Sequence, residues 1–262
     1  MLYKNLLKLF LILVFIFLYL PIIVLIIFSF DDSRFTATWC GFTFKWYLKL
    51  IHDSKLIEAL LNSLKIASIS VIVAAIMGTF SAYALTRFKF KGKTLSLGLI
   101  MLPIVIPEIA MGVSSLVLFN TLGLSLSINT IIVSHIVFCV SYITLVVMAR
   151  LEDFDLRLEE AAYDLGATPI TVFQKITLPI IFPGIFAGCL LAFILSLDDF
   201  IITQFTAGVG VTTIPLKIYS MVKFGVCPEI NAMSTILIIV TTSFAYLANN
   251  LIQNPQRSNT YR

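Results

Sequence analysis

The chain has 262 residues, of which 59% are hydrophobic and only 12% are charged, and its mean hydropathy is +1.02. Soluble domains carry about 25% charged residues, so this composition excludes an ordinary soluble protein. The formal net charge of +4 is small and scattered, which argues against a nucleic-acid-binding protein. Four cysteines without a C-x-x-C pair and only two histidines argue against a zinc or His-based metal centre. The composition is that of an integral membrane protein.

Apolar segments long enough to cross a bilayer recur along the chain. A helix needs about 20 largely apolar residues to span the hydrocarbon core. The first such segment carries no charge and no signal-peptide cleavage site follows it, so we expect a retained anchor. The predicted fold is all-α, with six spans at Leu9–Phe30, Ile66–Leu85, Leu95–Phe119, Ile131–Met148, Ile180–Phe205 and Ala232–Leu251.

The basic residues in the short connections predict how these spans are oriented. The connection 86–94 holds Arg87, Lys89, Lys91 and Lys93 without an acidic residue, whereas the connection 120–130 holds no charge. An excess of lysine and arginine marks cytoplasmic loops. We therefore expect both termini and the connection 86–94 to be cytoplasmic, and the segments 31–65 and 206–231 to face outward.

The polar connection between the fourth and fifth spans is predicted to form two short helices. The first should end at Leu165, with Gly166 after it in the left-handed conformation that glycine adopts most easily. Thr168 is the expected N-cap of the second, and Pro169 its first residue. Small alanines, together with the charges of Glu159 and Glu160, would suit docking on a partner, and the alternative is a solvated connector.

The spacing in this connection carries a resemblance to a known family. The matching residues are Glu160, Ala161, Ala162, Gly166, Ile176, Leu178 and Pro179. This pattern resembles the EAA loop of the membrane permeases of bacterial ABC importers, in which the loop is the coupling helix that sits in a cleft of the cytoplasmic ATPase. The resemblance implies the type I ABC importer permease (MetI-like) fold, and it implies that these residues couple the chain to an ATPase.

Other segments are similar to the spermidine/putrescine permeases within that family. They are Asn62–Leu64, Ser196–Phe200, Pro215–Ser220 and Pro228–Ala232, and Ser33–Phe35 and Lys45–Tyr47 fit the PotC-type subunit. This similarity implies a non-catalytic subunit of the cell inner membrane that imports polyamines by alternating access. It further implies three partners: a second permease subunit, an ATPase dimer that carries ATP and Mg, and an external polyamine-binding protein. No cofactor, metal or nucleic acid is expected on the chain itself.

The predicted organisation follows from the spans and the resemblance. It consists of a cytoplasmic tail at 1–8, a first transmembrane helix at 9–30, an outer loop at 31–61, a permease domain at 62–252 that includes the coupling loop 150–179, and a cytoplasmic tail at 253–262.

Three carboxylates inside the predicted spans are candidates for the substrate pathway. An ionisable residue within a span costs at least a few kcal/mol and marks a functional hypothesis by default. Glu108 and Asp198 each lie roughly 20 Å along the helix from the cytoplasmic start of their spans, and Asp199 follows directly. No basic residue in the spans is expected to neutralise them, whereas a polycation could. Both aspartates need not face the pathway, and the alternative is that they line water or are protonated.

Neighbouring residues complete the predicted site. Pro107 should break the helix before Glu108 and free backbone carbonyls, and Ser196 could add a hydrogen bond. Trp46 is a candidate because aromatic rings attract ammonium groups, although interface packing is equally expected. His135 is read as hydrogen-bonded packing and is left out of the site. Cys139 and Cys189 are read as packing residues, and Cys40 and Cys227 both face outward and could form a disulfide.

Alternatives remain open at this point. The cargo could be another small cation, ferric ion or a sulfur compound rather than spermidine or putrescine. The carboxylates could instead serve an ion-coupled transporter that works without an ATPase. A membrane enzyme lacks support because the sequence shows no catalytic cluster. Gly92-Lys93-Thr94 resembles the end of a phosphate-binding loop, but Arg87 stands where its first glycine should be, so no nucleotide site is expected.

Overall fold

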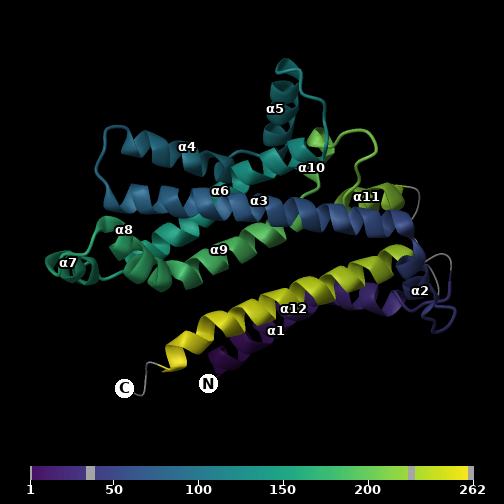
Figure 1. Ribbon diagram of the computed structural model, residues 1–262. Helices are drawn as coiled ribbons and strands as arrows, with labels where there is room; N and C mark the ends of the chain where they lie inside the picture. The colour runs from purple at the N-terminus through teal and green to yellow at the C-terminus, as the bar shows by residue number, and fades with distance from the viewer. Residues whose placement is uncertain (1, 34–38, 224–227, 259–262) are drawn as a thin grey trace. The chain divides into compact units, whose positions relative to one another are not determined.

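The computed structural model describes residues 2–33, 39–223 and 228–258, and the side chains of residues 3–33, 39–223 and 228–243. Apart from an isolated bridge between Asp31 and Phe42, the regular structure of this part of the chain is helical (Figure 1). The helices are α1 (Leu2–Phe28), α2 (Lys45–His52), α3 (Ser54–Arg87), α4 (Lys93–Val105), α5 (Glu108–Thr121), α6 (Ile128–Glu152), α7 (Arg157–Asp164), α8 (Pro169–Val172), the π-helical turn η1 (Phe173–Thr177), α9 (Leu178–Asp198), α10 (Ile201–Thr206), α11 (Ile214–Lys223) and α12 (Pro228–Ser258).

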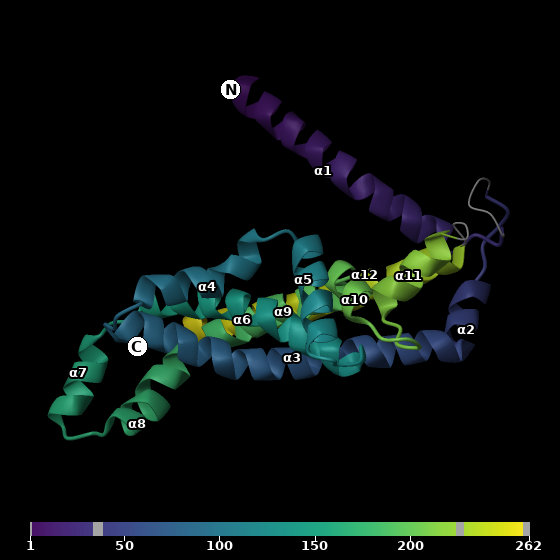
Figure 2. The ribbon, with the colours of Figure 1, turned by 90° about the horizontal axis from the view of Figure 1, so that it is seen from above.

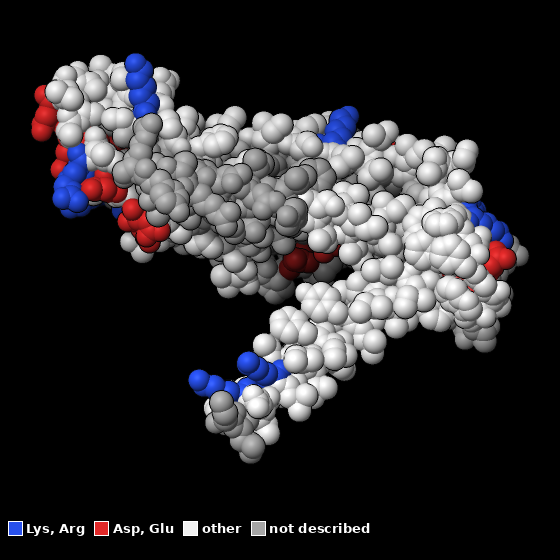
Figure 3. All heavy atoms as spheres, turned by 90° about the horizontal axis from the view of Figure 1, so that it is seen from below, with Lys and Arg blue, Asp and Glu red and all other residues white. Residues whose placement is uncertain are grey.

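The chain divides into two compact units, and the first combines Met1–Ile57 with Lys217–Phe244. Its long helix α1 shows an almost uncharged surface in the space-filling view, with basic side chains at its N-terminal end (Figure 3). After α1, two hydrogen bonds connect the chain to α2. The Ser29 hydroxyl lies 2.6 Å from the Tyr47 hydroxyl, and the Trp46 indole N–H donates to the Asp31 carbonyl at 2.7 Å. These bonds fix α2 against the end of α1.

The second unit combines Glu58–Leu216 with Ala245–Arg262 and contains most of the helices. In both ribbon views α3, α4, α6 and α9 run side by side, and α7 and α8 lie at one end of them (Figures 1 and 2). Small residues let these helices approach closely, as is common in membranes. A Cβ atom added to Gly78 of α3 would lie 2.9 Å from Ile143 Cγ2 of α6. Cys139 is fully buried in this core and Cys189 packs against it, as expected.

The membrane spans agree with the prediction in part. Within the described residues four helices are long and apolar enough to cross a bilayer: Tyr3–Phe28, Ser54–Arg87, Ile128–Glu152 and Pro169–Asp198. The pair α4 and α5 is a fifth candidate, bent by 109° where Pro107 was expected to break the helix. The sixth predicted span falls within α12. The count of six spans and the cytoplasmic termini remain predictions.

The predicted fifth span requires a correction, because it is not one continuous helix. The helix α9 ends at Asp198, and α10 begins only at Ile201. Asp199 between them has extended backbone, with ψ of 118°. The sequence pattern is apolar on both sides of this break, so hydropathy alone could not reveal it. Two residues of the family resemblance, Arg34 and Phe35, lie outside the described part of the chain, as does Cys227 with its predicted disulfide.

Candidate functional site

The break between α9 and α10 opens onto a pocket of about 320 Å³ in the second unit. The pocket contains all three predicted carboxylates together with aromatic and aliphatic side chains. Its lining comprises Pro103, Glu108, Met111, Phe138, Tyr142, Leu195, Asp198, Asp199, Phe200, Ile201 and Ile202. Residues from α4, α5, α6, α9 and α10 thus meet here, and two helix breaks supply the acids.

Glu108 reaches the pocket because α5 begins there. Pro107 has extended backbone, and Glu108 is the first residue of the helix that follows it. One turn further, Gly112 lies against α10: a Cβ atom on it would come within 2.7 Å of a ring carbon of Phe205. The absence of a side chain at Gly112 therefore sets how closely α5 approaches α10, and with it the position of Glu108.

Glu108 and Asp198 present free carboxylates to this pocket. Both residues are solvent-exposed. In the described part of the chain, no hydrogen bond or ion pair involves either side chain. Two unpaired negative charges in an aromatic-lined pocket favour binding of a cation, since opposite charges attract and aromatic faces also attract ammonium groups.

Asp199 differs sharply from its neighbour. Its side chain is 5% exposed, and its carboxylate accepts hydrogen bonds from the backbone N–H groups of Ile202, at 3.3 Å, and Thr203, at 2.8 Å. The Thr203 hydroxyl donates to the same carboxylate at 2.7 Å. Asp199 therefore caps the start of α10, as carboxylates often do at helix N-termini.

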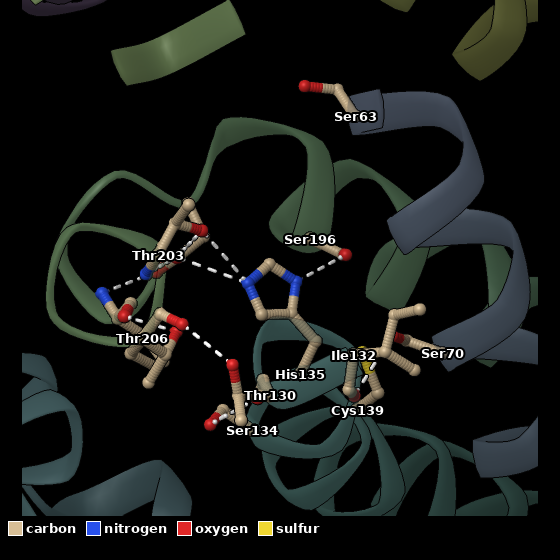
Figure 4. Close-up of polar contacts among 12 residues, drawn as sticks. Ser63, Ser70, Thr130, Ile132, Ser134, His135, Cys139, Ser196, Thr203 and Thr206 are labelled. Carbon is tan, nitrogen blue, oxygen red and sulfur yellow. Dashed lines mark hydrogen bonds and ion pairs between the residues drawn. The ribbon is translucent and has the colours of Figure 1, made fainter. Parts of the chain in front are cut away.

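His135 also contacts Asp199, so a titratable basic side chain does lie beside one of the acids, where none was expected. Its Nε2 lies 3.3 Å from Asp199 Oδ2. The Nδ1 atom of the same ring lies 2.7 Å from the hydroxyl of Ser196, which is also buried (Figure 4). Sequence reasoning left His135 out. The signal that could have found it is its place as a lone ionisable residue inside the apolar segment of the fourth span.

Trp46 belongs to the first unit and is 5% exposed. Lys45 and Lys49 of its own helix already lie over its ring, with Nζ 5.1 and 5.8 Å from the ring centroid. Lys49 also pairs with Glu229 at 2.6 Å. This geometry favours packing over substrate contact for Trp46.

The coupling loop has the local structure that its sequence predicts. The helix α7 ends at Asp164, Leu165 caps it, and Gly166 follows with φ of +83°. Thr168 caps α8 by accepting from the Thr171 N–H, and Pro169 is its first residue. Of the predicted coupling residues, Glu160, Ala161, Gly166 and Pro179 are exposed, and Ala162, Ile176 and Leu178 are half-buried.

Glu159 does not offer its charge to a partner, contrary to expectation. It is buried and pairs with Arg87 at the end of α3, with Nε 3.2 Å from Oε2. The Thr177 hydroxyl donates to Glu159 Oε1 at 2.7 Å. This cluster ties the loop to α3 and to η1. Glu160, the next residue, remains exposed on the loop surface.

Exposed features of the loop suit a docking surface. Leu165 and Ile170 on this polar loop are 90% and 69% exposed. A pocket of about 730 Å³ lies beside them, lined by aromatic residues of α3 and η1 and by both Glu159 and Glu160. On the same loop, hydrogen bonds donated by Arg157 hold the pKa of the exposed Asp155 below its usual range.

Comparisons with known proteins agree with this architecture. The family described as "Binding-protein-dependent transport system inner membrane component" matches residues 70–257. The spermidine/putrescine transport system permease protein PotC of Escherichia coli K12 is 41% identical over 232 residues, which are 88% of each chain. The putrescine transport system permease protein PotI of the same strain is 40% identical over 238 residues, covering 88% of this chain and 85% of that protein.

A solved structure shares the fold. A chain of a bacterial ABC transporter involved in the import of alginate superposes with a TM-score of 0.77 at 21% identity, covering 97% of this chain and 95% of that one. Family and fold together make the chain a multi-pass membrane subunit of a transporter rather than an enzyme. It belongs to the inner-membrane components of binding-protein-dependent transport systems.

Proposed function

We propose that the chain is the permease subunit of an ATP-driven importer that moves polyamines, spermidine or putrescine, into the cell. The observation that carries the proposal is the pair of unpaired carboxylates, Glu108 and Asp198, in one pocket. The PotC and PotI relatives, a spermidine/putrescine and a putrescine permease by name, support the same cargo class.

The chemistry of a polyamine fits this pocket. Its ammonium groups are separated by methylene spacers, so one molecule needs negative charges and apolar surface in alternation. Glu108 and Asp198 supply the charges from two different helices, and Phe138, Tyr142 and Phe200 line the same pocket with aromatic surface. Asp199 contributes to the pocket through its position at the break, since its carboxylate is already hydrogen-bonded.

We further propose the partners that such an importer needs. They are a second permease subunit (PotB-type), an ATPase dimer (PotA-type) that binds ATP and Mg, and an external binding protein (PotD-type) that delivers the polyamine. The exposed coupling residues of the loop, with Leu165 and Ile170 beside them, support a contact with the ATPase. ATP binding would then move the loop, and alternating access would follow in the helices joined to it.

Uptake into proteoliposomes tests the cargo. We expect complexes assembled with Glu108→Gln or Asp198→Asn to take up spermidine at least about tenfold more slowly. Each variant removes a carboxylate that the bound substrate would cover, and removing one partner of a charge pair shielded from water costs several kcal/mol. Glu58→Gln, which removes an exposed carboxylate of α3 outside the pocket, should leave uptake unchanged. Uptake of longer polyamines should fall further in the same variants. Wild-type uptake by both pocket variants would overturn the polyamine site.

The same vesicles separate the ATP-driven importer from an ion-coupled transporter. The proposal requires that uptake stops when the ATPase subunits are omitted or when ATP is withheld. The buried contact between His135 and Asp199 is an observation that would suit an ion relay. Uptake driven by an ion gradient without the ATPase would select that alternative.

Labelling tests the six-span topology on which the loop's cytoplasmic position depends. In a cysteine-free background, Phe90→Cys should react with an impermeant maleimide only from the cytoplasmic side. Ser125→Cys should react only from outside. Reversal of either pattern would place the coupling loop on the wrong side for an ATPase.

A further inference from the structure

The break between α9 and α10 falls within the predicted fifth span and leaves backbone groups that need partners. Within a span, unpaired N–H and carbonyl groups are tolerated only where protein or a water-filled cavity satisfies them. Asp199 meets part of this need by accepting from the N–H groups of Ile202 and Thr203. These hydrogen bonds fix the position of the Asp199 carboxylate and stabilise the first turn of α10.

One imidazole joins the two sides of the break. His135 projects from α6, and Figure 4 shows its ring between Ser196 and Thr203. Its Nδ1 lies 2.7 Å from the hydroxyl of Ser196 on α9. Its Nε2 lies 3.1 Å from the hydroxyl of Thr203 on α10. The ring therefore fixes α9 and α10 relative to α6 as well as to each other.

The hydrogen bonds close into a complete network with a neutral imidazole. The Thr203 hydroxyl donates to Asp199 Oδ2 at 2.7 Å, so its oxygen is left to accept from Nε2–H of His135. The Ser196 hydroxyl then donates to Nδ1. His135 is 1% exposed, and every polar atom of its ring has a partner. A network of this kind specifies one geometry, because any displacement leaves a buried group unsatisfied.

Asp198 lies in the sequence between Ser196 and Asp199, two residues whose side chains contact His135. Ser196 is two residues before it and Asp199 directly follows it, and both have their side chains turned to His135. Asp198 itself is exposed and lines the pocket with Glu108. The direction in which its carboxylate points is thus set by neighbours whose positions depend on the imidazole.

We propose that His135 is a positioning residue for the substrate site: it holds the α9–α10 break so that Asp198 faces Glu108 across the pocket. This inference rests on the proposed function, since it assumes that Asp198 receives an ammonium group. A histidine that only fills space in the core would not depend on Asp198. The two roles differ in what happens when Asp198 is already neutral.

A double-mutant cycle measures that dependence. The readouts are the half-saturating spermidine concentration and the maximal uptake rate of ATP-driven transport in assembled complexes. We expect His135→Leu to raise the half-saturating concentration roughly tenfold with a smaller effect on the maximal rate. In the Asp198→Asn background the same change should add less than about twofold, because coupled residues are not additive.

Two milder variants keep the test valid if His135→Leu assembles poorly. His135→Gln retains a donor near the Nε2 position and should stay within about threefold of wild type. Ser196→Ala removes only the Nδ1 partner and should raise the half-saturating concentration several-fold, again only while Asp198 is present. Thermal stability of each complex shows whether the effect exceeds a general loss of folding.

Each outcome decides a different claim. If Glu108→Gln and Asp198→Asn both leave uptake unchanged, the polyamine site of the proposed function fails. If only Asp198→Asn leaves uptake unchanged, the positioning role of His135 is overturned, because the residue it would position is not needed. If Asp198→Asn reduces uptake but the His135 and Ser196 effects multiply with it, the substrate site stands and the positioning role of His135 is overturned. Wild-type behaviour of His135→Leu with normal assembly would overturn it as well.

Discussion

Two pairs of adjacent acidic residues, one at the pocket and one on the coupling loop, divide their roles in the same way. In each pair one carboxylate is buried and bonded inside the protein: Asp199 contacts His135, and Glu159 contacts Arg87. In each pair the other, Asp198 or Glu160, is exposed. The pairs lie on different segments and we propose different partners for them, a polyamine and an ATPase.

The comparison indicates that in each pair the buried acid positions its exposed neighbour. Glu159 and Glu160 are neighbours on α7 and therefore point about 100° apart, so one can face the protein while the next faces outward. For Asp198 and Asp199 the extended backbone at the break separates the two directions. The internal bond of the buried acid then fixes where the exposed acid points. The two pairs differ in their counter-charge: Arg87 is always charged, whereas His135 can be satisfied while neutral.

The largest expected effect is the loss of stability when Arg87, the partner of Glu159, is replaced. We expect Arg87→Met to lower the free energy of unfolding by about 3–5 kcal/mol, because Glu159 would remain buried without its partner. Thermal unfolding of the purified complex measures this. Lys89→Met is the matched control, since Lys89 is an exposed basic residue two positions away and should be neutral. Equal stability of the two variants would show that Glu159 does not need Arg87 as its partner.

Gly112→Ala tests whether the close approach of α5 to α10 positions Glu108 in the pocket. The added Cβ would come within 2.7 Å of the Phe205 ring, and overpacking of this kind costs about 1–3 kcal/mol. We expect α5 to move away from α10, so that Glu108 shifts and spermidine uptake falls. Gly98→Ala on α4, where a Cβ meets open space, should leave uptake intact. Normal uptake by Gly112→Ala would show that the distance between α5 and α10 does not set the site.

Gly166→Val tests whether the loop's turn positions Glu160. Valine at φ of +83° is strained by about 1 kcal/mol or more, and the strain falls between α7 and α8. We expect normal membrane insertion, poor recovery of the ATPase with the permease, and lost transport. Gly210→Val carries the same strain at φ of +85° outside the loop and should keep the ATPase bound. Wild-type recovery with Gly166→Val would contradict the coupling role.

The smallest effect on stability is expected for Glu160→Gln. Because Glu160 is exposed, its neutralisation should leave the unfolding temperature unchanged while it weakens recovery of the ATPase. Asp164→Asn, which changes another exposed acid of the same loop that makes no side-chain hydrogen bond or ion pair in the described part of the chain, should affect neither quantity. A large drop in unfolding temperature for Glu160→Gln would show that the two acids of the pair are not distinct.

Sequence patterns predicted the parts of the molecule that local chemistry governs. Gly166, Thr168 and Pro169 have strong conformational preferences, and the structure of the loop follows them. Hydropathy and Pro107 likewise anticipated the bent pair α4 and α5. Charge inside apolar segments was enough to select Glu108, Asp198 and Asp199, which share one pocket.

Sequence patterns could not predict which acid of each pair is buried. That choice depends on residues far away in the chain: Asp199 meets His135 of α6, and Glu159 meets Arg87 of α3. The break after Asp198 was missed for a different reason: the local hydrogen bond from Thr203 to Asp199 that stabilises it lies in a segment that is apolar on both sides, so hydropathy predicts one continuous span. Contacts between distant segments leave no periodic signal in a single sequence.

The direct test of the division within a pair compares Asp198→Asn with Asp199→Asn in the same assembled complex. Spermidine uptake and unfolding temperature are measured for each. We expect Asp198→Asn to lose uptake by about tenfold without a change in unfolding temperature, because it removes a charge that only the substrate meets. Asp199→Asn should lower stability by about 1.5–3 kcal/mol, since it weakens charged hydrogen bonds within the protein. The opposite pattern, with a stable Asp199→Asn and an unstable Asp198→Asn, would contradict the account.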